Sequence, residues 1–192
     1  EGAQAAARPG TAWPFEEYAA RQLRDFNGQR LAGALYAAVR LQRGGAPFFE
    51  AAAVQLRRAH RDVLAPQGLA QACSAAAEAI PAVGLRQPLG LLGDLEPRCR
   101  HLAAVLAPWQ VVWLVTAYAD AAVARAGIGS ARQLWRSQQD ARQFLVDLCS
   151  RGAVTIGEPS RFAALCRQAQ RIIEAEQLPA DLLGDLEDMP RS

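Results

Sequence analysis

The stretch PWQVVWLVTAYADAAVARA, Pro108–Ala126, decides the fold. It opens on a proline, which a helix accommodates in its first turn, and Gly127, a residue type that often ends helices, follows it. The 18 residues Leu102–Ala119, which overlap it, carry no charge. This length reaches the lower limit for a membrane span, but Pro108 interrupts the run and the mean hydropathy of the chain is -0.03. We therefore expect no membrane span, and instead a helix buried on all sides at the centre of a helical bundle.

The two tryptophans of this stretch share one side of the expected helix. Trp109 and Trp113 are four residues apart, a spacing that places both side chains on the same face. In a helix that is buried on all sides, they are expected to pack in the core. If they were exposed instead, the pair would be a binding hot spot.

The composition of the whole chain also favours helices. Of the 192 residues, 51% are hydrophobic and 21% are charged, and the net charge is +2. This is enough apolar material for a sizeable core, and the low, balanced charge excludes a polycation or a disordered tail. Alanine and leucine dominate, whereas aromatic residues make up only 7%, a bias that favours helix over sheet.

Helical periodicity recurs on both sides of Pro108–Ala126, with proline and glycine between the segments. We expect an all-α, single compact domain of about eight or nine mostly antiparallel helices. The longest loop is expected at Pro81–Gly90, with Pro81 ending the helix before it. The expected helices cover Pro14–Phe26, Gln29–Arg43, Pro47–Leu64, Leu69–Ile80, Leu95–Ala107, Pro108–Ala126, Ala131–Arg151 and Pro159–Gln177, with a short final turn around Pro179–Leu186.

The chain is expected to have three parts. Residues 1–12 are rich in alanine, glycine and proline and are expected to be a flexible N-terminal segment. Residues 13–177 form the helical domain, and residues 178–192 an acidic amphipathic C-terminal segment.

The six letters LLGDLE occur twice, at Leu91–Glu96 and at Leu182–Glu187. One interpretation is a degenerate repeat of two helical units, because the segments before the two copies also align, with Cys73 on Cys166. The other is a shared turn, in which Gly93 and Gly184 end helices with positive φ and an aspartate starts the next element. The sequence around the copies is dissimilar, so we favour the shared turn and leave the repeat open.

All 21 basic residues are arginine. Codon bias in a GC-rich genome, such as that of a high-GC bacterium or a large DNA virus, explains more of these positions than selection for phosphate or carboxylate recognition does. Two clusters could nevertheless contact nucleic acid: Arg57, Arg58 and Arg61 in the first, Arg98 and Arg100 in the second. The near-zero net charge favours a solvated helix face at Arg57, Arg58 and Arg61.

Motifs of catalysis and metal binding are missing from the sequence. The four cysteines, Cys73, Cys99, Cys149 and Cys166, form no C-x-x-C pair and are expected to be buried free thiols in a reducing compartment, the cytoplasm or the nucleus. The chain has two histidines, no Walker loop and no G-x-G-x-x-G. We therefore expect neither an enzyme, nor a metal site, nor a cofactor.

The C-terminal segment LPADLLGDLEDMP, Leu178–Pro190, interleaves apolar and acidic residues. Acidic amphipathic segments near a terminus often lie in a groove, on their own domain or on a partner. We expect a non-enzymatic, helical protein–protein interaction or scaffolding module that binds another protein or a second copy of itself; the alternative is a helical nucleic-acid-binding domain using the arginine clusters. The candidate partner-binding residues are Leu178, Leu182, Leu183, Leu186, Met189, Asp181 and Asp185.

Overall fold

The computed structural model describes residues 22–43, 45–60, 63–128, 134–182 and 184. In these residues it is all-helical, with seven α-helices packed against one another and no strand, which confirms the all-α class. The expected eight or nine helices and the two-unit repeat are not confirmed. The helices are α2 (Gly28–Arg40), α3 (Ala46–Gln55), α4 (Pro66–Val83), α5 (Arg86–Leu102), α6 (Pro108–Gly127), α7 (Gln138–Thr155) and α8 (Pro159–Glu176), with short segments at η1 (Leu23–Asp25), η2 (Leu56–His60) and η3 (Ala103–Val105).

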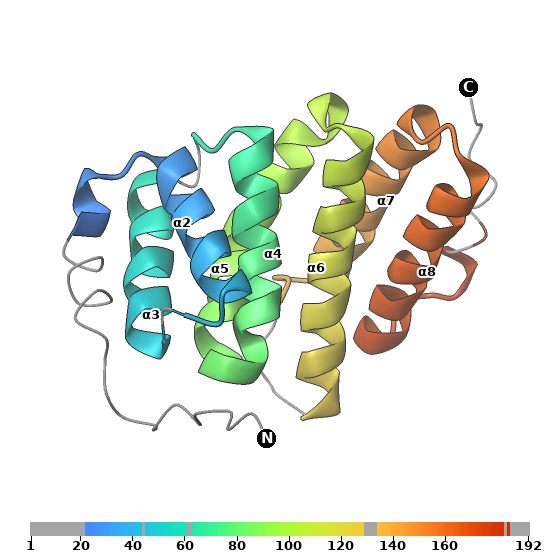
Figure 1. Ribbon diagram of the computed structural model, residues 1–192. Coiled ribbons are helices and arrows are strands. Elements are labelled where there is room, and N and C mark those ends of the chain that lie inside the picture. Colours follow the sequence, from blue (N-terminus) through green and yellow to red (C-terminus); the bar gives the residue numbers. More distant parts are fainter. Residues whose placement is uncertain (1–21, 44, 61–62, 129–133, 183, 185–192) are drawn as a thin grey trace, which may run out of the picture.

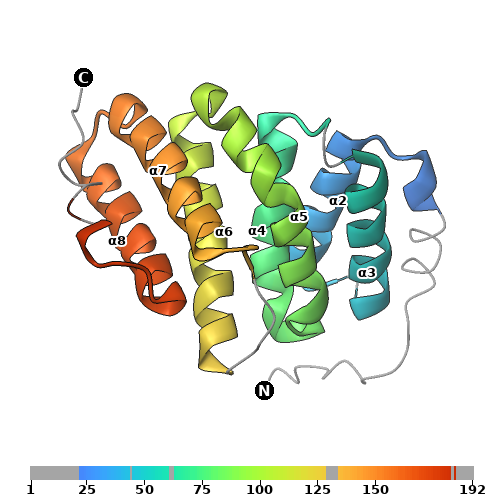
Figure 2. The ribbon, with the colours of Figure 1, turned by 180° about the vertical axis from the view of Figure 1, so that it is seen from behind.

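The seven helices form two layers. Figures 1 and 2 show α2, α4, α6 and α8 side by side in one layer, and α3, α5 and α7 in the other. Because consecutive helices run antiparallel, the four helices of the first layer all point the same way. This leaves the first layer with a broad outer face built from four parallel helices.

Helix α6 lies in the middle of this layer, between α4 and α8, with α7 behind it. Leu114, Val115 and Tyr118 are fully buried, as the apolar stretch predicted. One strip of α6 nevertheless faces solvent, so the expectation of a helix buried on all sides is wrong for this strip. Trp109 and Trp113, which were expected in the core, are 44% and 37% exposed. In the part of the chain that the structure describes, no helix is both long enough and apolar enough to span a bilayer.

The first LLGDLE copy lies in the middle of a helix. Helix α5 runs through it without a break, and Gly93 does not have positive φ. Gly184 does not have positive φ either, and the one described glycine that does is Gly84, between α4 and α5. The shared turn and the long loop at Pro81–Gly90 are therefore wrong. The helix continues because Leu91, Leu92 and Leu95 bury their side chains in the core.

The absence of a side chain at Gly93 has a different use, which is to let α5 pass close to another part of the backbone. A Cβ atom there would lie 3.1 Å from the carbonyl oxygen of Leu134, in the segment that leads into α7. The expected helix stop at Pro81 also fails, because α4 continues to Val83 with the proline ring on its exposed side.

Substitution of Gly152 by alanine is expected to lower the free energy of unfolding by about 1–2 kcal/mol, although alanine favours helix by about 1 kcal/mol. The new Cβ would clash with Cδ2 of Leu165, and this leucine is fully buried between α7 and α8 and has no room to turn. Urea unfolding followed by circular dichroism measures the change.

Gly68→Ala is the matched control. Its Cβ would meet Oε1 of Gln29, the end of an exposed side chain that is free to move. This variant is expected to be as stable as the parent, or more stable by up to about 1 kcal/mol. Equal stability of both alanine variants would contradict tight packing at Gly152.

Candidate functional site

The outer face of the first layer carries a row of aromatic side chains, Tyr36, Trp113 and Trp109, which we call the aromatic ridge. The ring centroids of Tyr36 and Trp113 are 5.8 Å apart and the rings are stacked at 26°. Trp109 meets Trp113 edge-on, with centroids 5.0 Å apart and planes at 78°. Offset-stacked and edge-to-face geometries are the favourable ones for aromatic pairs. The ridge is therefore held in place by its own contacts.

The ridge crosses three helices. Tyr36 is on α2 and the tryptophans are on α6, while α4 lies between these two helices in the layer. The rings meet because α4 presents small residues beneath them, Ser74 and Ala77. Small side chains on the middle helix thus set the position of the ridge.

Two hollows flank Trp113. The first, of about 230 Å³, is almost entirely apolar and has one cation, Arg161, at its edge. Its other lining residues are Pro108, Trp109, Val112, Trp113, Ile156 and Ala164. The second, of about 320 Å³, is mixed in character and is lined by Tyr36, Arg40, Ser74, Ala77, Glu78, Trp113, Thr116, Ala117 and Asp120.

Ion pairs surround the ridge on the same face. Arg40 lies 3.4 Å from Glu78, Arg171 lies 2.8 Å from Asp120, and Arg161 lies 2.7 Å from Glu158. Exposed pairs of this kind contribute at most about 1 kcal/mol each. They are weak enough to exchange their partners for charges on another molecule. The face therefore combines rigid apolar anchors with an adaptable polar border.

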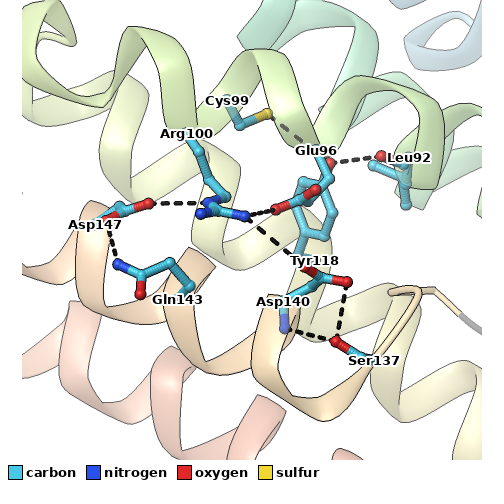
Figure 3. A network of polar contacts seen from close by, with 9 residues as sticks. All are labelled: Leu92, Glu96, Cys99, Arg100, Tyr118, Ser137, Asp140, Gln143 and Asp147. Atoms are coloured by element: carbon cyan, nitrogen blue, oxygen red, sulfur yellow. Dashed lines mark hydrogen bonds and ion pairs between the residues drawn. The ribbon is translucent and has the colours of Figure 1, made fainter.

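A second polar cluster, which we call the acidic joint, lies within the second layer and joins α5 to α7 (Figure 3). Arg100 is surrounded by three carboxylates: Asp147 at 3.0 Å, Glu96 at 3.5 Å and Asp140 at 3.9 Å. Gln143 donates a hydrogen bond of 2.8 Å to Asp147. The positive charge of Arg100 thus offsets the negative charges of several carboxylates, and the cluster serves to hold α5 against α7.

Burial changes the acid–base properties of groups near this joint. It raises the pKa of Glu96, an effect that Arg100 opposes and Asp140 reinforces. Burial also raises the pKa of Cys149 to about 12 and that of Cys73 well above its usual value. Thiols with such pKa values stay protonated at neutral pH and are poor nucleophiles. All four cysteines are buried, and none forms a disulfide with another described residue.

Arginines of the nucleic-acid alternative are largely engaged inside the molecule. Arg100 belongs to the acidic joint, Arg98 donates two hydrogen bonds of 3.2 Å to the carbonyl of Leu64, and Arg57 donates one of 2.9 Å to Gln87. Arg58 is exposed, and Arg61 lies outside the described residues. The guanidinium groups of Arg57, Arg98 and Arg100 are thus directed at internal acceptors.

The candidate partner-binding leucines at the C-terminus fall into two groups. Leu178 and Leu182 are buried in the core of this domain, 7% and 1% exposed, while Asp181 points to solvent. Leu183, Asp185, Leu186 and Met189 lie outside the described residues. The two described leucines therefore contact their own domain.

The sequence correctly predicted that Trp109 and Trp113 share one face of the helix, but it wrongly predicted that this face is buried. It did not single out Tyr36 as their neighbour. The i, i+4 spacing showed that the tryptophans act together. Nothing in the spacing showed that α4 would bring Tyr36 to them.

Among the residues that the structure describes, no group of three or more histidine, cysteine, aspartate or glutamate side chains is arranged to hold a metal ion. Comparisons of the chain with protein-family models, with curated proteins and with solved structures gave no match.

Glu96→Gln is expected to make stability less dependent on pH. A carboxyl whose pKa is raised by folding favours the folded state fully below its unfolded pKa, near 4.5, and this contribution is lost as pH rises through the folded pKa. Glutamine keeps the shape of the side chain but does not titrate. As pH rises from 4 to 7, the free energy of unfolding of the variant should therefore increase relative to that of the parent, by on the order of 1 kcal/mol. Urea unfolding at several pH values measures this, with exposed Glu174→Gln as the control. An identical pH profile for parent and Glu96→Gln would contradict the raised pKa.

Proposed function

We propose that this protein is a non-enzymatic helical module that binds another protein through the aromatic ridge and its two hollows. The observation that carries the proposal is a pair of tryptophans, 44% and 37% exposed, that are stacked into a rigid array on an open face. Tryptophan and tyrosine are the residue types most often found as energetic anchors of protein interfaces. Fixed rings also lose little conformational entropy on binding.

The hollows suggest how a partner would be seated. An apolar side chain fits the 230 Å³ hollow against Trp109, Val112 and Ile156, where it would be shielded from water. The ion pairs at the border supply charges of both signs for the rim of the interface. We therefore propose the aromatic ridge, in place of the C-terminal leucines, as the main binding surface, because Leu178 and Leu182 are buried in the core of this domain.

The nucleic-acid alternative has weaker support, since Arg57, Arg98 and Arg100 are engaged with internal acceptors. Binding of RNA or DNA that is lost when Arg57 and Arg58 are changed to glutamine would favour it. The four buried cysteines, which form no disulfide among the described residues, support our expectation of a reducing compartment.

The double variant Trp109→Ala/Trp113→Ala is expected to weaken partner binding at least about 100-fold, because two anchors of about 2 kcal/mol or more are lost. A photo-crosslinking residue at Thr116, in the second hollow, captures the partner, and one at Val154 on the other layer serves as the comparison. Calorimetry with the purified partner then gives the Kd of each variant.

The matched control is Val105→Ser/Val154→Ser, which changes exposed apolar residues outside the ridge and its hollows. It should bind as the parent does. A partner whose Kd is unchanged by the double tryptophan variant would rule out the ridge as the docking surface. If the captured molecule is a second copy of the chain, sedimentation should show a dimer that the tryptophan variant loses.

A further inference from the structure

A pocket of about 310 Å³ lies at the opposite end of α6 from Trp109, where the last turns of α6 and α8 meet the start of α7. It is lined by Arg125, Trp135, Ser137, Gln138, Ala141, Ala175, Glu176 and Gln177, and we call it the end pocket. Arg125 is sixteen residues from Trp109, about 24 Å along the helix axis. The end pocket is therefore separate from the aromatic ridge.

A largely buried ion pair forms part of its wall. Nη2 of Arg125 donates a hydrogen bond of 2.8 Å to Oε2 of Glu176, and the two side chains are 17% and 15% exposed. Nη2 also donates to the carbonyl of Ala175 at 3.4 Å. The pair is electrically neutral, and it is joined to α7 through Gln138, whose amide donates to the Glu176 carbonyl at 3.4 Å.

Three of the side chains that line the pocket each carry a buried polar atom without a hydrogen-bond partner: Nε of Arg125, Nε1 of Trp135 and Oε1 of Glu176. Trp135 is 6% exposed. Across the described residues, one further buried side-chain atom has no hydrogen-bond partner, Oε1 of Glu96, which lies 3.5 Å from Arg100 in an ion pair, so three of the four belong to residues that line this pocket. An unpaired buried polar group costs about 1–3 kcal/mol, and native proteins pair the great majority of them. Such a concentration in the wall of one pocket indicates a binding site.

The hydrogen-bonding character of the three atoms indicates which chemical group of a ligand would pair with them. Two are N–H donors, on Arg125 and Trp135, and the third is a carboxylate oxygen, on Glu176. A primary carboxamide matches this set, because its carbonyl oxygen accepts two hydrogen bonds and its nitrogen donates. A carboxylate ligand would be repelled by Glu176, and an ammonium group by Arg125.

We propose that the end pocket binds a small neutral molecule through a primary carboxamide group. The carbonyl oxygen accepts from Nε of Arg125 and Nε1 of Trp135, and the amide nitrogen donates to Oε1 of Glu176. In the structure without ligand these three atoms are shielded from solvent. The ligand reaches these atoms only if a lining side chain moves, and we assign this movement to Gln138, which is exposed and donates a hydrogen bond of 3.4 Å to the Glu176 carbonyl on α8.

Nuclear magnetic resonance of the ¹⁵N-labelled full chain tests this directly. The chain has four tryptophans and hence four indole N–H signals, and Trp135→Phe assigns the one that matters. Nicotinamide is the probe and nicotinic acid, its isosteric anion, is the comparison. The Trp135 signal should move downfield and saturate with nicotinamide, and should stay in place with nicotinic acid.

Glu176→Gln should weaken nicotinamide binding about tenfold, because the charged acceptor is replaced by a neutral amide oxygen, which forms a weaker hydrogen bond. Glu174→Gln, on the exposed side of the same helix, should bind as the parent does. If Glu176→Gln does not fold, Trp135→Phe tests the same point, since it keeps a smaller aromatic ring in the core and loses the N–H. Its binding of nicotinamide, followed by the backbone signals of Gln138 and Ala141, should also be weakened.

The proposal is overturned if the Trp135 signal does not move, if nicotinic acid moves it equally, or if the folded variants bind as the parent does. A parallel titration with N-acetylglutamine methylamide identifies the source of the carboxamide. A larger effect than that of nicotinamide would indicate a glutamine side chain of a peptide, and a smaller one a free aromatic amide. Failure of the ridge variants to affect partner binding would leave this result untouched, because the two sites share no lining residue.

Discussion

Arg100→Met is expected to lower the free energy of unfolding by about 3 kcal/mol. The substitution keeps much of the apolar length of the side chain but removes the cation that forms the ion pairs with Glu96, Asp140 and Asp147. The side chain of Glu96 is 10% exposed and would then be a buried charge without its ion-pair partner, with Arg136 as the cation that still acts on it. Removing one partner of a buried pair typically costs about 3–5 kcal/mol, and the lower end applies because Arg100 is 32% exposed.

Urea unfolding at pH 7 measures this change, and Arg142→Met, an exposed position on α7, is the control with an expected change within about 0.5 kcal/mol. Adding Glu96→Gln to Arg100→Met should restore about 1–2 kcal/mol, because the buried carboxylate is then gone. If Arg100→Met and Arg142→Met have the same stability, the acidic joint does not hold α5 to α7.

Leu182→Ala is expected to lower the free energy of unfolding by about 3 kcal/mol, as large-to-small changes in cores do. Leu182 is 1% exposed and lies after the end of α8, in the core of the domain. Its sequence neighbour Asp181 is exposed, so Asp181→Ala should stay within about 0.5 kcal/mol of the parent. Thermal and urea unfolding of the two variants give the comparison.

This experiment also decides the role of the C-terminal segment. The sequence alone left two possibilities for its leucines, a groove on this domain or a partner. A less stable Leu182→Ala variant that still binds its partner agrees with the burial seen in the structure. A variant with unchanged stability that no longer binds would return the docking surface to the C-terminus.

The bounds of α6 and α8 could be predicted because their local signals agree with their tertiary environment. Each begins at a proline, Pro108 or Pro159, and ends within a residue of the expected position. The stop expected at Gly93 failed because Leu91, Leu92 and Leu95 are buried and continue the helix. At Pro81 the helix runs on for two residues, and the break comes at Gly84. A glycine is a weak stop when the residues around it gain more from burial than the break would give.

The two candidate sites could not be found from the sequence for a different reason. Each depends on the order of helices within a layer. Tyr36 reaches Trp113 over α4, and Arg125 meets Glu176 across 51 positions of chain. Spacing along one helix shows which residues share a face, but only the neighbouring helices determine whether that face is covered.

The small residues of α4 beneath the aromatic ridge have a consequence for the motions of the layer. Because Tyr36 and Trp113 touch over α4, a molecule that covers both rings contacts α2 and α6 at once, although neither helix is the other's neighbour in the layer. Binding to the native state alone raises the free energy of every opening that breaks the bound surface. A partner seated on the ridge would therefore slow amide hydrogen exchange in α2, at the edge of the layer, together with that in α6.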